Sequence, residues 1–258
     1  MSNNKTALIT GASAGLGKEF SQRLAAAGYQ LVLVARRKEK LDELAADIRG
    51  THGVAVHTIS ADLSDPASPE EIFEEVSATG LHIDFLVNNA GAAGCDLLLD
   101  RKWPVQQDFF QLMMLSVAHL CHLFIPGMRE NGFGRVINIA SVAGRVPRVG
   151  GCNYGPSKAY LIALSEDLSV TLHGSGVNVC ALCPGYVHTD FHSTAGLEDM
   201  KNDMPAWLWY DAATVVADGL RAVEKGRPVY LSGRLYRWID PFFQSIWTRR
   251  FFRVPSRH

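Results

Sequence analysis

The sequence is poor in cysteine, in net charge and in long apolar runs. Its five cysteines are an odd number scattered over 258 residues, so they do not form a disulfide framework. The formal net charge is −1, which provides no overall field to attract nucleic acid. No run reaches the roughly 18 apolar residues of a membrane-spanning helix, and the polar start Met1–Thr6 has no apolar signal segment. These absences predict a cytoplasmic protein in a reducing compartment.

Charged residues make up only 20% of the chain, too few for a disordered protein, whereas apolar residues make up 47%. A chain of 258 residues fits one large α/β domain with a buried core. We predict that residues 1–233 form this domain, including a substrate loop at residues 191–210, and that residues 234–258 form a C-terminal extension.

Strand-like and helix-like segments alternate along the chain. The strand-like segments are apolar runs at Ala7–Thr10, Leu31–Ala35, Val54–Ile59, Ile83–Val87, Arg135–Ala140, Val177–Leu182 and Pro228–Leu231. The helix-like segments are Lys18–Ala27, Glu39–Arg49, Glu70–Ala78, Val105–Arg129, Tyr154–His173 and Ala212–Glu224. The alternation predicts a doubly wound parallel sheet of the α/β class with helices on both faces. Functional residues are therefore expected just after the strands, at their carboxyl ends.

A glycine-rich turn follows the first predicted strand. It reads Thr10-Gly11-Ala12-Ser13-Ala14-Gly15-Leu16-Gly17 and leads into a helix. Glycines allow a tight turn and bring backbone amides close to a pyrophosphate, and the helix N-terminus adds partial positive charge. The spacing differs from the most common dinucleotide pattern, and a glycine cluster alone also fits an ordinary turn. Its place in the first βα unit favours dinucleotide binding.

The second predicted strand ends in Ala35, Arg36 and Arg37. NAD sites often place a carboxylate here for the ribose 2′-hydroxyl, and no acid is present. Two guanidinium groups suit a 2′-phosphate, although solvated surface arginines would look the same. The residues favour NADP(H).

A tyrosine and a lysine stand four residues apart where a helix is predicted to begin. Tyr154 and Lys158 would share one helix face, with their Cβ atoms about 6 Å apart. The lysine cation would favour the phenolate of Tyr154 and make it a usable general acid or base. Ser141, just after the strand Arg135–Ala140, could hold a substrate oxygen. Each feature alone is common on protein surfaces.

Taken together, the chain resembles the short-chain dehydrogenase/reductase family over nearly its whole length. The matching motifs are T-G-x-x-x-G-x-G at Thr10–Gly17, Asp62-Leu63, N-N-A-G at Asn88–Gly91, the serine after Asn138-Ile139-Ala140, Y-x-x-x-K at Tyr154–Lys158 and P-G-x-V-x-T at Pro184–Thr189. The resemblance implies a seven-stranded Rossmann-type sheet and hydride transfer between NADP(H) and an alcohol or ketone.

The resemblance also implies roles for single residues. Ser141 would polarise the substrate, Tyr154 would be the acid/base, and Lys158 would be its electrostatic partner and a ribose ligand. Tyr154 and Lys158 would both also bind the cofactor. The remaining cofactor-binding residues would be Gly11, Ser13, Gly15, Leu16, Gly17, Arg36, Arg37, Asp62, Leu63, Asn89, Ala90, Gly91, Pro184, Gly185, Val187 and Thr189.

One position departs from the family pattern. The family usually has an asparagine in the fourth helix, where this chain has Met113. Methionine cannot replace the hydrogen bonds of asparagine, although its main-chain carbonyl could still hold a relay water. A cofactor-binding sensor or scaffold with weakened catalysis is therefore the alternative to an active enzyme.

Other patterns are better explained by structure than by chemistry. Cys180 and Cys183 lie on a predicted strand, where redox C-x-x-C pairs do not sit, so we interpret them as core residues. The pairs His119/His122 and His188/His192 lack an acidic or cysteine partner at ligand spacing, so no metal site is predicted.

Three further expectations concern substrate, assembly and the C-terminus. Met200, Met204, Trp207, Trp209 and Tyr210 in the loop at 191–210 suggest a bulky apolar substrate. The family resemblance implies pairing of the fourth and fifth helices in a homodimer or homotetramer. Residues 234–258 carry six arginines and seven aromatic residues but a single acid, Asp240. This extension is expected to pack on its own domain or a partner subunit, or alternatively to contact an anionic membrane.

Overall fold

A parallel sheet forms the centre of the protein. The computed structural model describes residues 5–92, 96–98, 102–146, 153–188, 209–245 and 247–248. Within these ranges the sheet strands are β1 (Thr6–Thr10), β2 (Gln30–Ala35), β3 (Val56–Ser60), β4 (Phe85–Asn88), β5 (Gly134–Ile139), β6 (Val177–Cys183) and β9 (Val229–Leu231). Their order is β3-β2-β1-β4-β5-β6-β9, and every pairing is parallel. The predicted seven-stranded doubly wound sheet is confirmed.

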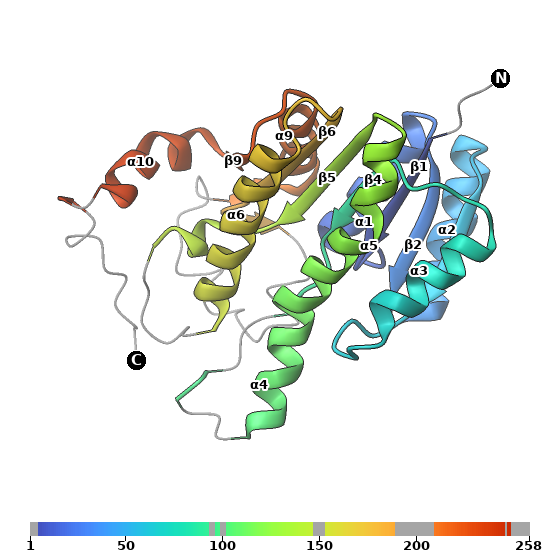
Figure 1. Cartoon of the computed structure of the whole chain (residues 1–258), viewed down its shortest axis with the longest axis horizontal. Helices are drawn as coiled ribbons and strands as arrows, with labels where there is room; N and C mark the ends of the chain where they lie inside the picture. Colours follow the sequence, from blue (N-terminus) through green and yellow to red (C-terminus); the bar gives the residue numbers. More distant parts are fainter. Residues whose placement is uncertain are drawn as a thin grey trace.

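Helices cover both faces of this sheet (Figure 1). The helices α1 (Gly15–Ala26), α2 (Lys38–His52) and α9 (Ala212–Glu224) pack on one face. The helices α3 (Ser68–Ala78), α5 (Ser116–Glu130) and α6 (Tyr154–Thr171) pack on the other. This two-sided cover explains why the strands are apolar on both faces, as a buried parallel sheet requires. The order reverses beside β1, which has β2 on one side and β4 on the other, and ligands of such folds bind at this switch point.

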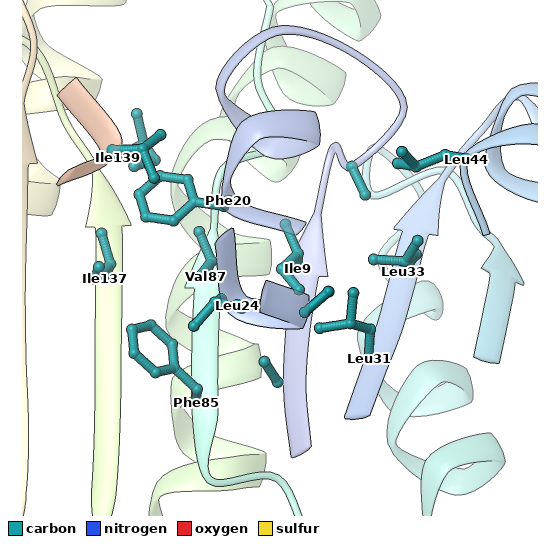
Figure 2. Packing of buried hydrophobic residues seen from close by; sticks show 14 of the residues in the cluster. Ile9, Phe20, Leu24, Leu31, Leu33, Leu44, Phe85, Val87, Ile137 and Ile139 are labelled. Carbon is teal, nitrogen blue, oxygen red and sulfur yellow. The ribbon is translucent and has the colours of Figure 1, made fainter. Parts of the chain in front are cut away.

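The first of the two cores lies between the sheet and α1, α2 and α9. Figure 2 shows Phe20 and Leu24 of α1 against Ile9, Phe85 and Val87 of the strands. Phe20 has no exposed surface. Truncation of such a buried ring to alanine costs about 3–5 kcal/mol, so α1 is held firmly on the sheet.

A buried polar chain fixes α6 on the opposite face. Asn88 Nδ2 donates to Asn138 Oδ1 at 2.9 Å, and Asn138 Nδ2 donates to Ser165 Oγ at 3.0 Å. Ser165 in turn donates to the Leu161 carbonyl at 2.7 Å. All three polar residues are at most 2% exposed, so their bonds form away from water, where leaving one unmade is costly. The register of α6 against β4 and β5 is thereby specified.

The predicted helix Val105–Arg129 is built from three parts. These are α4 (Trp103–Phe110), a π-helical turn η1 (Gln111–Leu115) and α5. By length and composition alone, Trp103–Glu130 could cross a membrane, but half of its apolar window is buried within the fold. Met113, Leu120 and Phe124 are among its buried residues. Its apolar character is therefore explained by packing on the sheet.

Two elements near the carboxyl edge were not predicted. A small parallel pair joins β7 (Tyr186–His188) to β8 (Trp209–Asp211). The helix α10 (Arg234–Gln244) follows β9 and lies at the side of the molecule (Figure 1).

Candidate active site

The predicted site residues meet because their strands end together. Register pairs Thr10 with Val34, Asn88 with Asn138 and Ile139 with Leu182, all at the carboxyl edge of the sheet. The first turn, the Asn89 segment, Ser141 and Pro184 follow directly from these ends. Thr189 lies outside the described residues.

The glycine turn leaves room that side chains would fill. Gly11 and Gly15 have φ values of 62° and 53°, which disfavour other residues. A Cβ on Gly17 would collide with the Gly11 carbonyl oxygen, so α1 can approach the turn only with glycine there. The N-cap residue Ala14 supplies no side-chain cap, and the first amides of α1 keep their hydrogen-bonding capacity. This cradle fits the pyrophosphate of a dinucleotide.

Hydrogen bonds join this turn to the segment after β4. Thr10 Oγ1 accepts from the amides of Asn89 and Ala90 at 2.9 and 3.0 Å. Asn89 Nδ2 donates to the carbonyls of Thr10 and Gly11 at 2.9 and 3.1 Å. Two of the predicted cofactor segments, 79 residues apart in the chain, therefore form one surface.

Two guanidinium groups, those of Arg36 and Arg37, follow the end of β2. Arg37 Nη2 donates to Ser13 Oγ at 3.3 Å, which places this guanidinium beside the glycine turn. Arg36 Nη1 lies 3.7 Å from Asp62 Oδ2, and 72% of its side chain is exposed. Burial raises the pKa of Asp62, but hydrogen bonds from Ser64 and the charge of Arg36 outweigh burial and hold the pKa below its usual value. Asp62 is therefore ionised.

Two further residues of the predicted cofactor site, Leu16 and Leu63, are apolar. Leu63 is 4% exposed and belongs to the core under α3 and α5, while Leu16 packs partly buried on the other core. The side chain of Leu63 is therefore buried, whereas that of Leu16 is still partly exposed beside the glycine turn.

Met113 contacts the predicted cofactor segment. The amide of Ala92 donates to Met113 Sδ at 3.3 Å, and a Cβ on Gly91 would lie 3.3 Å from the same sulfur. Met113 is 1% exposed and sits in the π-turn η1. The thioether thus supports the loop after β4 as an acceptor at the position where the family has an asparagine.

Tyr154 and Lys158 occupy the first turn of α6. Lys158 is 5% exposed, and its Nζ lies 5.6 Å from the centre of the Tyr154 ring. The same Nζ donates to the Ile139 carbonyl at 2.7 Å, at the end of β5. Burial lowers the pKa of Lys158 to about 8, against a smaller raising effect of Cys183. The ammonium is therefore placed to stabilise a phenolate one helical turn away.

Ser141 begins the short 3₁₀ turn η2 (Val142–Gly144) that follows β5. Its Oγ accepts from the Ala143 amide at 3.1 Å and keeps its own hydrogen for another acceptor. Gly144 lies against the backbone of α6, where a Cβ would come 2.7 Å from the Ala159 nitrogen. Ser141 and α6 are thus held close together by a glycine contact.

The segment after β6 borders the same edge. The Pro184 carbonyl accepts from the Val142 amide at 3.0 Å, and Val187 is 5% exposed in the core. Gly185 lies directly under the ring of Tyr236, so no side chain fits at this position.

Sequence reasoning missed one buried pair beside Tyr154. Asn153 Nδ2 donates to Gln106 Oε1 of α4, and Gln106 Nε2 donates to the Asp96 carbonyl at 3.3 Å. Both amide side chains are at most 2% exposed. The adjacency of Asn153 to Tyr154 was the available signal, but nothing in the chain pointed to Gln106, which lies 47 residues away.

The patterns set aside from the sequence have structural roles. Cys180 and Cys183 lie on β6 without exposed surface, and burial raises the pKa of each to about 12, so both are inert core thiols. His119 lies 3.3 Å from Glu70, and His188 stacks on Trp209. Within the described ranges, no group of three potential ligands could hold a metal ion.

Most of the chain is similar in sequence to known dehydrogenases and reductases. Residues 5–199 match the family model described as short chain dehydrogenase. The 3-oxoacyl-acyl-carrier-protein reductase FabG of Escherichia coli (strain K12) is 33% identical over 195 residues, covering 76% of this chain and 78% of its own.

Solved structures extend the likeness beyond that segment. A short-chain dehydrogenase from Sphingobium yanoikuyae in complex with NADPH superposes with a TM-score of 0.81 at 32% identity and covers 91% of each chain. A bulky-bulky ketone specific alcohol dehydrogenase from Comamonas testosteroni superposes with a TM-score of 0.79 at 28% identity, covering 92% of this chain and 90% of its own.

Proposed function

The chain belongs to the short-chain dehydrogenase family, and we propose that it is an NADP(H)-dependent oxidoreductase that interconverts a secondary alcohol and a ketone. The observation that carries the proposal is the first turn of α6. There, Lys158 Nζ is fixed by the Ile139 carbonyl at 2.7 Å and lies 5.6 Å from the Tyr154 ring centre. Ser141 follows β5, the strand that ends at Ile139, and so lies at the same carboxyl edge of the sheet.

The residues present fit NADP(H). The glycine turn would hold the pyrophosphate. Arg36 and Arg37 would hold the 2′-phosphate, since no acidic residue follows β2 directly in the chain and the contact of Arg36 with Asp62 is long, at 3.7 Å. Asp62 and Leu63 would lie at the adenine, and the backbone of Asn89, Ala90 and Gly91 would line the groove. The NADPH-bound relative from Sphingobium yanoikuyae supports this choice of cofactor.

The chain's own residues would manage the proton. When bound, the nicotinamide supplies or accepts the hydride at the substrate carbon. Tyr154 would donate a proton to the carbonyl oxygen in reduction and remove it from the hydroxyl in oxidation. The ammonium of Lys158 favours the phenolate formed after donation, and Ser141 donates a hydrogen bond to the substrate oxygen. Pro184, Gly185, Val187 and Thr189 would border the nicotinamide.

The substrate we propose is bulky and apolar. The superposable bulky-bulky ketone specific enzyme supports this class. Two aromatic residues of the loop at 191–210 pack against other parts of the fold. Trp209 packs on Tyr186, and the ring centre of Tyr210 lies 6.2 Å from that of Tyr236. Met200, Met204 and Trp207 lie outside the described residues.

We also propose a homodimer or homotetramer in the cytoplasm. Leu115 on the long helix and Tyr160 and Val170 on α6 are exposed apolar side chains, 54%, 38% and 78% accessible, and association would cover them. Light scattering should show an oligomer that Val170→Glu dissociates. The alternative that residues 234–258 contact an anionic membrane is supported by Trp238 and Phe242, which are both exposed on α10. Co-sedimentation with phosphatidylglycerol vesicles tests this alternative.

Activity is tested by a panel of ketones and alcohols, followed by NADPH absorbance. Tyr154→Phe should lower kcat by at least about 100-fold and leave NADPH affinity within about twofold, since only the proton donor is lost. Tyr29→Phe, just before β2 at the opposite edge of the sheet, is the matched control. NADPH binding without turnover of any panel member would instead favour the sensor or scaffold alternative suggested by Met113.

A further inference from the structure

The C-terminal helix α10 contacts two of the loops that build the candidate site. It lies beyond residues 5–199, the part of the chain that matches the family model. Its inner face carries Tyr236, Asp240 and Gln244, which bond to residues following β5 and β6. The outer face carries Trp238 and Phe242, which are 81% and 54% exposed.

The first contact is a forked ion pair next to the Ser141 turn. Arg145 Nε donates to Asp240 Oδ1 at 2.8 Å, and Arg145 Nη2 donates to Asp240 Oδ2 at 2.6 Å. The two side chains are only 17% and 15% exposed. A bidentate arginine–carboxylate pair with limited water access fixes direction as well as distance, unlike a solvated surface pair.

The same arginine is held through its backbone. Gln244 Nε2 donates to the Arg145 carbonyl at 3.2 Å, and the Arg145 amide closes η2 by donating to the Val142 carbonyl at 3.0 Å. Since Gly144 packs on α6 at Lys158, the turn η2 is held between α6 and α10. Ser141 lies at the start of this turn.

The second contact lies under the segment after β6. The ring of Tyr236 covers Gly185, and the Tyr186 amide hydrogen-bonds to the Tyr236 oxygen. Burial is the main cause that raises the pKa of Tyr236 to about 12, so this hydroxyl stays neutral and structural. The helix α10 thus touches both the Ser141 turn and the Pro184–Gly185 segment.

We propose that α10 is a positioning element of the active site, and that Asp240 is the positioning residue through which it sets the orientation of the Ser141 turn. The inference rests on the proposed function, because Ser141 matters only if it binds the substrate oxygen. In this proposal Asp240 acts through Arg145, with which it pairs, and not by contact with substrate or cofactor.

Asp240→Asn tests the proposal, because it keeps the shape of the side chain but removes the charge and one of the two acceptors. We expect kcat to fall about tenfold or more, because small displacements of an aligned group are costly, while NADPH affinity stays within about twofold. Glu224→Gln is the matched control: it breaks the 2.9 Å pair with Arg135 at the opposite end of β5, and kcat should stay at the wild-type value. If Asp240→Asn does not fold, Arg145→Lys, which retains the charge but not the fork, replaces it.

Hydrogen exchange provides a readout that does not depend on turnover. In Asp240→Asn, the amides of Ala143, Gly144 and Arg145 should exchange faster by at least about tenfold, whereas Glu224→Gln should leave them protected. Wild-type kcat together with unchanged exchange in Asp240→Asn would overturn the inference. An inactive wild type that binds NADPH would contradict the proposed function alone, and the exchange difference would still decide the role of α10.

Discussion

Burial of Lys158 predicts a measurable dependence of stability on pH. In the unfolded chain this amine keeps its proton up to its usual pKa of 10.5, whereas in the folded protein its pKa is about 8. Between these two values the unfolded chain binds more protons, so the free energy of unfolding increases with pH. A difference of this size corresponds to about 3 kcal/mol, which is present in full above the unfolded pKa and lost as the pH falls through 8.

The variant Lys158→Met isolates this effect, because it keeps the length of the side chain and removes the titrating group. The unfolding free energy of the wild type minus that of the variant should rise by about 3 kcal/mol from about pH 7.5 to about pH 10.5. Urea denaturation of the cofactor-free protein, followed by tryptophan fluorescence across this range, measures the difference. Other titrating groups are common to both proteins and cancel.

Lys225→Met is the control, because Lys225 is exposed at the end of α9. It removes a lysine at the surface, so it shows what the loss of an exposed amine does to the same curve. A pH dependence for Lys158→Met no larger than that for Lys225→Met would refute the reasoning, since it would mean that the ammonium is hydrated in the folded state. A falling difference would mean that the folded protein holds the proton more tightly than the unfolded chain.

Three further predictions follow from the site and the core. Arg36→Asp should weaken NADPH binding by about 10- to 100-fold, because one charge-assisted contact to the 2′-phosphate is lost, and it should weaken NADH binding much less. Fluorescence titration measures both affinities, and equal losses for the two cofactors would contradict the role of Arg36. Gly17→Ala should lower the affinity for NADPH at least about tenfold, because the new Cβ would collide with the Gly11 carbonyl oxygen. Gly50→Ala on α2 is the comparison: its Cβ would meet no neighbouring atom, so thermal unfolding should show a protein more stable by up to about 1 kcal/mol. Cys180 and Cys183 should resist alkylation until the protein unfolds, as peptide mass spectrometry can show, because burial raises the pKa of each to about 12; rapid labelling of the native protein would contradict this.

Much of the fold could be predicted because local patterns and tertiary structure agree. Each of the seven apolar runs became a strand of the sheet, since both faces of a parallel sheet demand apolar side chains. The errors in these seven strands are at their boundaries. The run from Val54 was expected to be extended, but Gly53 ends α2 with a φ of 67° and the ladder with β2 begins only at Val56.

The elements that sequence reasoning missed depend on distant contacts. The π-turn at Gln111–Leu115 has the same apolar pattern as the α-helix around it, so periodicity could not reveal it. The pair β7–β8 joins segments more than 20 residues apart in the chain through only three residues each. Long-range pairing of this kind carries no local signal.

Part of the candidate site could be predicted because its residues belong to local sequence motifs. Motif residues follow strands, so the fold brings the glycine turn, Ser141, Tyr154 and Lys158 to one edge. Their roles stay predictions until the variants are measured. Asp240 was noted only as the single acid of a basic segment, and its pairing with Arg145, 95 residues earlier, required three-dimensional structure.

The position of β1 between β2 and β4 has a consequence for biosynthesis. Among the seven strands of the sheet, β1 is synthesised before the others and pairs with β2 soon afterwards. Its partner on the other side, β4, follows about 75 residues later. At roughly 5–20 residues per second the nascent chain exposes one unpaired apolar strand edge for several seconds. Such an edge invites pairing with other chains, so slower production at low temperature or together with a chaperone should raise the yield of folded protein.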